Sequence, residues 1–153
     1  MNRNINLSVI TGLSALILLA AISVSATTYT WEEAGTGNWN DSGNWDNGIP
    51  TAVTGDATYI SNGGTAIIPT GYDSAVSDGL FLGYLFGDSG HIVQKGGTLT
   101  VSGQFFVGRA GAGTYTLNGG LLDYNGTEFT LGREGDATAG AASFYQKGGE
   151  VQA

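Results

Sequence analysis

LFLGYLFGDSGHIVQKGGTLTVSGQ, the stretch from Leu80 to Gln104, is followed by two further copies of the same pattern. The second copy, FFVGRAGAGTYTLNGGLLDYNGTE, spans 105–128, and the third, FTLGREGDATAGAASFYQKGGEVQA, spans 129–153. Self-similarity at a period of about two dozen residues is typical of repeat architectures, in which each unit packs on its neighbours. Residues 80–153 therefore decide the fold.

The apolar positions alternate within each copy, as the two-residue period of a β-strand requires. The corresponding positions predict columns of inward side chains, and in copy order these columns are Leu80, Phe105 and Phe129; Leu82, Val107 and Leu131; Ile92, Tyr115 and Phe144; Leu99, Leu122 and Val151; and Val101, Tyr124 and Ala153. Three short strands per repeat fit one turn of a parallel β-helix, in which each coil pairs with the coils above and below. We therefore predict an all-β parallel β-helix (β-solenoid) of about four coils.

One inward column is polar, because Gln94 and Gln146 flank Leu117 in it. A buried amide is unfavourable unless its hydrogen bonds are satisfied. We expect these amides to bond the backbone of a nearby turn. The third copy also carries an insertion, Glu134–Gly140, which we expect on a loop because a repeat accepts extra residues there without losing strand register.

Residues 1–26 have the pattern of a secretory signal peptide. Arg3 precedes an apolar run over 7–21, and small residues end the segment at Ala26. The apolar run is shorter than the ~20 residues that a membrane-spanning helix needs. We predict a signal-peptide helix that is removed after Ala26, so that the secreted chain begins at Thr27 and contacts a membrane only through the leader.

Residues 27–79 are expected to form an N-terminal cap and a degenerate first coil. Trp31, Trp39 and Trp45 are separated by Gly, Asn and Asp, which favour tight turns. One interpretation is a glycan-stacking platform, with an indole face against a sugar ring. The other is a hydrophobic plug over the end of the stack, because solenoids need terminal caps. The large area that three indoles bury favours the plug.

The composition excludes several classes of function. The chain has 27 Gly and 41% hydrophobic residues, which indicates a packed protein with many turns. It has no Cys, which excludes disulfides, thiolate metal sites and a Cys nucleophile. Its net charge is −8 and it has only five Lys and Arg, which argues against nucleic-acid binding.

No residue set predicts catalysis, a cofactor or a metal. The single His, His91, is expected on an outward column and belongs to no Ser–His–Asp arrangement. Asp123, Glu150 and Asp88 fall at different phases of the repeat. A pair of carboxylates brought together across coils remains the alternative, since such a pair can cleave a glycosidic bond. Acidic residues in the turns leave calcium binding open.

Three patterns carry a family resemblance: GxYTLNGG at 113–120, FxVGR at 105–109 and GNWNxxxNW at 37–45. They resemble the Gly-rich β-helical repeats of bacterial secreted surface proteins of the autotransporter-passenger and exosortase-sorted kind. The resemblance implies a right-handed parallel β-helix located outside the cell or on its surface. It also implies extracellular polysaccharide or other surface proteins as partners.

The expected function is that of a secreted or cell-surface structural or adhesive module without catalytic activity. The alternatives are a carbohydrate-binding module that uses the Trp-rich segment and a polysaccharide-acting β-helix enzyme. The last repeat has no cap of its own. This predicts either a truncated fragment or end-to-end self-association through the last coil, whose strand edges would otherwise stay unpaired.

Overall fold

The computed structural model describes residues 25–76, 78–132 and 140–153, whose regular structure is β apart from one 3₁₀ turn, η1 (Ser42–Asn44). The strands are β1 (Thr28–Thr30), β2 (Thr36–Asn38), β3 (Ala57–Ile60), β4 (Asn62–Ile68), β5 (Ser74–Val76), β6 (Gly79–Leu82), β7 (Ser89–Gln94), β8 (Thr98–Val101), β9 (Gln104–Val107), β10 (Ala112–Leu117), β11 (Leu121–Tyr124), β12 (Glu128–Leu131), β13 (Ala142–Gln146) and β14 (Glu150–Gln152). The predicted signal peptide lies outside the described residues except for Ser25 and Ala26, as does the predicted loop insertion except for Gly140.

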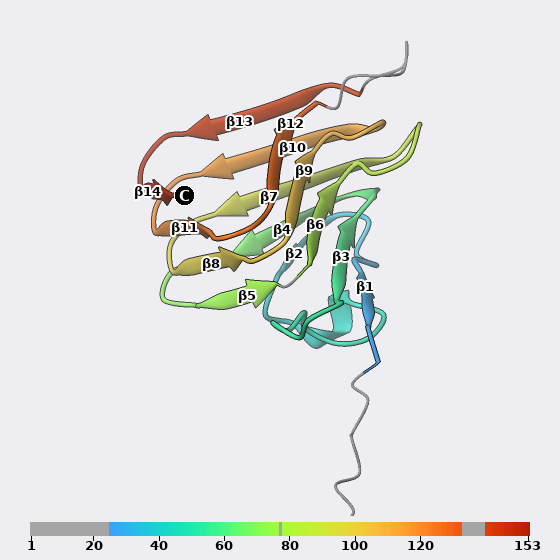
Figure 1. Ribbon diagram of the computed structural model, residues 1–153, viewed down its shortest axis with the longest axis horizontal. Coiled ribbons are helices and arrows are strands. Elements are labelled where there is room, and N and C mark those ends of the chain that lie inside the picture. The colour runs from blue at the N-terminus through green and yellow to red at the C-terminus, as the bar shows by residue number, and fades with distance from the viewer. Residues whose placement is uncertain (1–24, 77, 133–139) are drawn as a thin grey trace, which may run out of the picture.

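The strands form three parallel sheets that run along the stack (Figure 1). One sheet contains β1, β3, β6, β9 and β12, which we call sheet A; the second contains β2, β4, β7, β10 and β13; the third contains β5, β8, β11 and β14. Successive strands make five coils: β1–β2, β3–β5, β6–β8, β9–β11 and β12–β14. The predicted all-β parallel β-solenoid is confirmed, with one coil more than expected.

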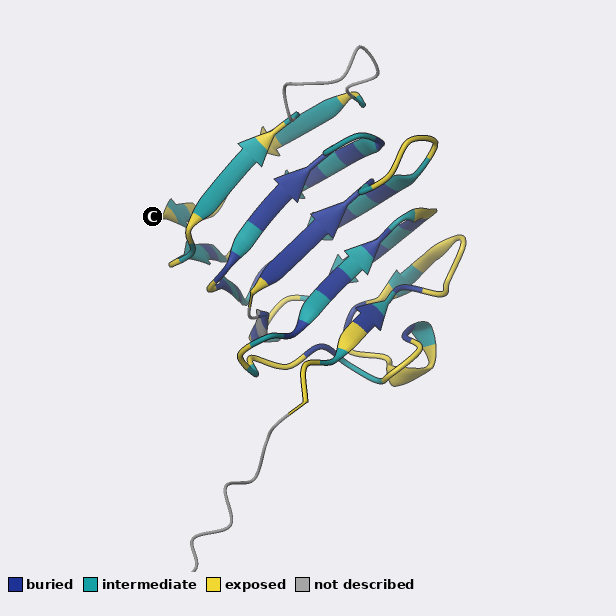
Figure 2. Ribbon diagram, turned by 45° about the vertical axis from the view of Figure 1, so that its right-hand side comes forward, coloured by how far each residue is buried: buried dark blue, intermediate teal, exposed yellow. Residues whose placement is uncertain are grey.

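The repeat alignment gave the correct register between coils 3, 4 and 5. The paired positions are Leu80, Phe105 and Phe129; Leu82, Val107 and Leu131; Ile92, Tyr115 and Phe144; Gln94, Leu117 and Gln146; Leu99, Leu122 and Val151; and Val101 with Tyr124. The core consists of these columns. Their apolar side chains are 0% exposed in coils 3 and 4, Tyr124 excepted. In coil 5, where Figure 2 shows less burial, they are partly buried, except for the exposed Leu131.

The additional coil comes from the Trp-rich segment. β1 pairs in parallel with β3, and β2 pairs in parallel with β4. The segment that the sequence predicted as a cap therefore also contributes the first, two-stranded coil. Its strands are three residues long and lie between turns rich in Gly, Asn and Asp, so no apolar period marks them.

The double glycines of the repeat mark one turn per coil, between the second and third sheets. The second glycine of each pair has a left-handed backbone, with φ of 66° at Gly97, 85° at Gly120 and 75° at Gly149. A side chain is unfavourable in that conformation, which Gly adopts without steric penalty. The recurrence of these glycines is thus a requirement of the corner.

Candidate functional site

The three tryptophans close the first end of the solenoid. Trp31, Trp39 and Trp45 are 1%, 0% and 3% exposed. Trp45 makes edge-to-face contacts with both other indoles, with ring centroids 4.9 Å apart in each case, and its Nε1 donates to the Trp39 carbonyl at 2.8 Å. A sugar ring needs an open aromatic face, and these faces are covered. The geometry is that of the predicted plug, and it leaves no stacking platform on these residues.

The backbone explains how so short a segment buries three indoles. Residues beside Trp45 run antiparallel to the end of β1, with Glu32 N donating to Asn44 O at 2.9 Å and Asp46 N donating to Thr30 O at 3.1 Å. The strand edge of β1 is therefore partly paired by the plug itself. Asp41 caps η1 by accepting from Gly43 N at 3.0 Å, which fixes the turn between β2 and Trp45.

The polar inward column contains a buried hydrogen-bond network. Gln94 is 0% exposed, and its Nε2 donates to the carbonyls of Gly97 at 3.1 Å and Leu121 at 2.9 Å. Its Oε1 accepts from the Tyr115 hydroxyl of the next coil. Gln146 repeats the turn contact, with Nε2 donating to Gly149 O at 3.1 Å. The prediction that these amides bond a nearby turn is confirmed, and the role is structural.

Removing the Tyr115 hydroxyl tests this network. Burial raises the pKa of Tyr115, so the hydroxyl stays protonated and donates to Gln94 at ordinary pH. Tyr115→Phe leaves the Gln94 carbonyl oxygen buried without its donor, and we expect the free energy of unfolding in urea to fall by about 1–3 kcal/mol. Thr116→Val is the matched control, because Val93 occupies the same outward column. Equal losses in the two variants would contradict the network's role.

The residues considered for catalysis do not converge. His91 lies on the outward column with Thr114 and Ser143, as predicted. Thr65 of coil 2 occupies the same column. Asp88 caps the loop after β6 by accepting from Leu85 N at 2.9 Å. Among the described residues, no group of three or more His, Cys, Asp or Glu is placed to hold a metal ion.

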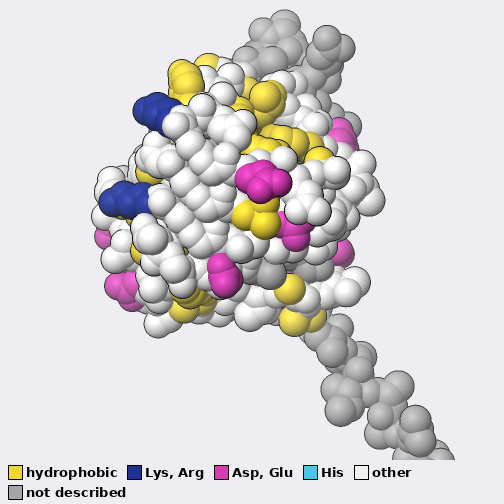
Figure 3. Space-filling model, turned by 90° about the vertical axis from the view of Figure 1, so that its left-hand side faces the viewer, with side chains coloured by type: hydrophobic (Ala, Val, Ile, Leu, Met, Phe, Trp, Pro, Cys, Tyr) yellow, Lys and Arg dark blue, Asp and Glu magenta, His cyan; other side chains and the backbone are white. Residues whose placement is uncertain are grey.

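Asp123 and Glu150 lie on neighbouring strands of the third sheet but are offset by two positions. Asp123 is in register with Gln152, whereas Glu150 is in register with Leu121. The Asp123 carboxylate accepts from the Thr100 hydroxyl at 3.4 Å. Figure 3 looks onto this side of the molecule and shows acidic side chains separated by uncharged atoms. Asp123 and Glu150 therefore occupy different positions of the repeat, as the sequence predicted.

An aromatic cluster on the outer face of sheet A was not predicted. We call Tyr59, Phe81, Tyr84, Phe106 and Arg109 the outer cluster. Tyr59 stacks on Phe81 with ring centroids 4.9 Å apart, and Phe81 packs against Phe106 at 5.5 Å. Phe81 and Phe106 are 5% and 2% exposed, whereas Tyr59 and Tyr84 are partly exposed.

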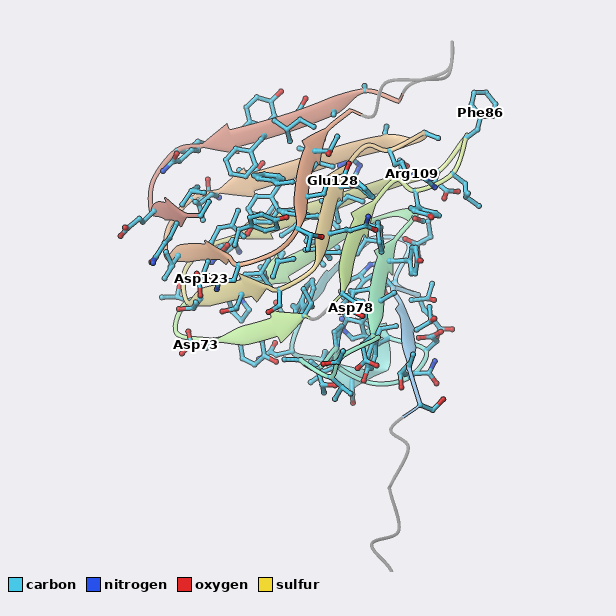
Figure 4. The ribbon with its side chains drawn as sticks, viewed as in Figure 1. Asp73, Asp78, Phe86, Arg109, Asp123 and Glu128 are labelled. Carbon is cyan, nitrogen blue, oxygen red and sulfur yellow. The ribbon has the colours of Figure 1, made fainter. Side chains whose placement is uncertain are left out.

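Arg109 brings a positive charge to the outer cluster. Its guanidinium carbon lies 4.5 Å from the centroid of the Tyr84 ring, and Tyr84 contacts Tyr59 and Phe81 edge-to-face. Burial raises the pKa of Tyr59, as does the neighbouring Tyr84, while Arg109 opposes the shift. In Figure 4 Arg109 and Phe86 lie towards one side of the molecule and Asp73 and Asp123 towards the other.

The sequence did contain a signal for the outer cluster. Leu80–Leu82 and 105–107 are continuous apolar runs of three, LFL and FFV, within strands that otherwise alternate. A continuous run indicates a strand covered on both faces, as in buried parallel sheets. The middle residues, Phe81 and Phe106, are the ones that point outward and are covered by the cluster.

The last coil presents partly exposed apolar side chains. Leu131 is 51% exposed, and Phe129, Phe144 and Val151 are partly buried. The residues of coil 4 in the same columns are fully buried. β12, β13 and β14 each pair on one side only. The end-to-end self-association expected from this coil stays a prediction.

Searches of protein-family models, of curated proteins and of solved structures found no match to this chain. No helix in the described part of the chain is long and apolar enough to cross a membrane.

Proposed function

We propose that this protein is a secreted or cell-surface structural module without catalytic activity, whose leader is removed after Ala26. The observation that supports the proposal most is the column pattern. The inward positions recur between coils because they pack the core, while the outward column of His91, Thr114 and Ser143 on the second sheet varies in chemistry. A solenoid of this kind provides a stiff spacer, and the residues of its loops and outer faces can change without disturbing the core.

Expression of the full chain in a bacterium with a functional export pathway tests this proposal. We expect the protein in the extracellular or surface-exposed fraction, with Thr27 as its first residue by N-terminal sequencing, because residues 1–26 match a cleavable leader. The purified product is expected to release no fragments from a panel of acidic and neutral polysaccharides. Retention in the cytoplasm with the leader intact would contradict export. Cleavage that disappears in Asp123→Asn or Glu150→Gln would contradict the non-catalytic role.

We propose, as a second candidate function, binding of an acidic extracellular polysaccharide by the outer cluster. Tyr59 and Tyr84 offer partly exposed aromatic rings, and rings of this type can pack against sugars. Within the described residues Arg109 pairs with no carboxylate, so its guanidinium is available to a uronate group. This proposal moves the expected sugar contact away from the buried tryptophans to the outside of sheet A.

Retention on immobilised polygalacturonate, with neutral dextran as the comparison matrix, tests the second candidate. We expect Arg109→Ala and Tyr84→Ala each to weaken retention about tenfold, because each removes one charged or aromatic contact worth roughly 1–2 kcal/mol. Phe86→Ala is the matched control, since this ring is 76% exposed on the same loop as Tyr84 but outside the cluster. Equal retention of all three variants, or equal binding to dextran, would contradict the proposal.

A further inference from the structure

We propose that removal of the leader creates an α-ammonium group at Thr27 that pairs with the buried carboxylate of Asp56 and fastens the start of the first coil. The inference rests on the leader cleavage proposed above and assigns a structural purpose to the new N-terminus. Cleavage would convert the Thr27 amide into an ammonium group at a place where the fold already holds Thr27 N against the Asp56 carboxylate.

The two groups are already in contact. Thr27 N donates to Asp56 Oδ1 at 2.7 Å, although these residues lie 29 positions apart in the chain. Ala57 N donates to the Thr27 carbonyl at 3.0 Å, so the main chain of Thr27 is held on both sides, immediately before β1 begins at Thr28. Cleavage before Thr27 therefore removes no strand residue and leaves its nitrogen beside the carboxylate.

The Asp56 carboxylate is buried and has no cation as a partner among the described residues. It is 1% exposed, and its other oxygen accepts from the Thr51 hydroxyl at 3.3 Å, so its described hydrogen-bond donors are neutral. A buried carboxylate is unfavourable unless it is paired with a positive charge and fully hydrogen-bonded. An ammonium supplies the charge and turns the existing contact into a charge-assisted hydrogen bond, which is about twice as strong as a neutral one.

The surroundings offer no other described cation. The described Lys and Arg residues are Lys95, Arg109 and Lys147, which all belong to coils 3 to 5. Besides Asp56, the titratable groups that bond near or along β1 are Tyr29, whose hydroxyl bonds Thr51 at 3.0 Å, and Asp46, whose Oδ1 accepts from Thr30 N at 2.7 Å at the other end of the strand. Asp56 is therefore the carboxylate that the described residues place against Thr27, at the start of β1.

The bond to be cut is accessible. Ser25 and Ala26 are exposed, and Thr27 is partly exposed, so the Ala26–Thr27 peptide lies at the surface. Ala26 lies against Gly55, where an added Cβ would be 3.0 Å from the Ala26 Cβ. This contact is small, and its loss on cleavage is minor beside the gain of a charge pair.

A double-mutant cycle tests the proposal with protein that starts at a defined residue. A chain beginning at Thr27 and one beginning at Ser25 are released from a fusion by a protease that leaves no extra residue, each with Asp56 and with Asp56→Asn. In urea at pH 6 we expect the unfolding equilibrium constant of the Thr27 chain to be about tenfold lower than that of the Ser25 chain. We expect the difference to vanish with Asp56→Asn, which keeps the shape but removes the charge. An equal difference in both backgrounds, or none in either, would overturn the proposal.

Acetylation of the Thr27 chain is the matched control, because it removes the charge without adding residues, and it keeps the test decisive if Asp56→Asn does not fold. The acetylated chain should match the Ser25 chain in stability. Pairing should also raise the pKa of the Thr27 amine above its usual ~7.7–8.0, which NMR of the labelled amine measures. The added stability is then complete below that range and is lost as the pH rises through the raised pKa. An amine pKa at or below its usual value would overturn the ion pair. Because these chains are made without export, a failure here is separate from a failure of secretion, which N-terminal sequencing detects.

Discussion

Gly90→Ala is expected to lower the free energy of unfolding by about 3 kcal/mol or more, because the added methyl group has no space. A Cβ at this position would lie 1.8 Å from the carbonyl oxygen of Ile60 and 2.6 Å from its carbonyl carbon. Both atoms belong to the backbone of the preceding coil, so a change of side-chain rotamer cannot relieve the overlap. The coil itself has to move.

The position of Gly90 makes that movement unfavourable. The Ile60 carbonyl accepts a hydrogen bond from Gly83 N at 3.0 Å, which ties coil 2 to coil 3 at the corner where β6 leads into β7. Gly90 also pairs with Gly113 of the next coil. A Cβ added at Gly113 would lie 2.2 Å from Gly108 N and 2.7 Å from Leu82 O, so this position is also crowded. A methyl group at Gly90 therefore separates two coils that share a ladder of hydrogen bonds.

Gly43→Ala is the matched control for this prediction. Its Cβ would meet no atom closer than Asp41 Oδ1 at 3.3 Å, and its backbone is not left-handed. We expect its stability in urea to stay within about 1 kcal/mol of the parent chain. If Gly90→Ala unfolds at the same urea concentration as Gly43→Ala, the close approach between coils 2 and 3 is wrong.

The repeat made the middle of the fold predictable. Each inward position in coils 3 and 4 has an aligned counterpart, so side-chain type and register could be deduced together, and even the polar column of Gln94 was placed correctly with its bond to the turn at Gly97. Parallel in-register stacking is the reason, because identical positions of successive coils occupy identical environments. One alignment therefore fixes both the face and the partner of a residue.

The two ends and the outer face were less predictable for a physical reason. Coil 1 departs from the repeat because its strands are held by the plug at Trp45 rather than by a third strand, so it has no aligned copy. The outer cluster depends on loop residues Tyr84 and Arg109 reaching over a sheet face, and contacts of this kind follow from loop shape. Alternation alone assigns Phe81 to solvent. The continuous apolar run indicates that Phe81 is covered, and the loop residues that cover it leave it 5% exposed.

Trp39→Ala is expected to lower the free energy of unfolding by about 3–5 kcal/mol, the usual loss for removing a buried aromatic ring from a core. Trp39 is fully buried, and its main-chain N donates to Ile67 O at 2.8 Å, which places it directly beyond the end of β2. Its loss leaves Trp45 without one of its two aromatic partners. Trp31 then remains as the other contact of the plug.

The loss should be local, because each coil of a solenoid contacts only its neighbours and a terminal coil can open separately. Amide hydrogen exchange measures this directly. In Trp39→Ala we expect β1 and β2 to lose protection by a factor of about 10² or more, while β10 and β11 of coil 4 stay close to the parent. Tyr145→Ala is the matched control, since this ring is 51% exposed at the other end and should leave β1 and β2 unchanged. Uniform deprotection of all coils in Trp39→Ala would show that the plug supports the whole solenoid, and unchanged exchange of β1 and β2 would show that it supports none of it.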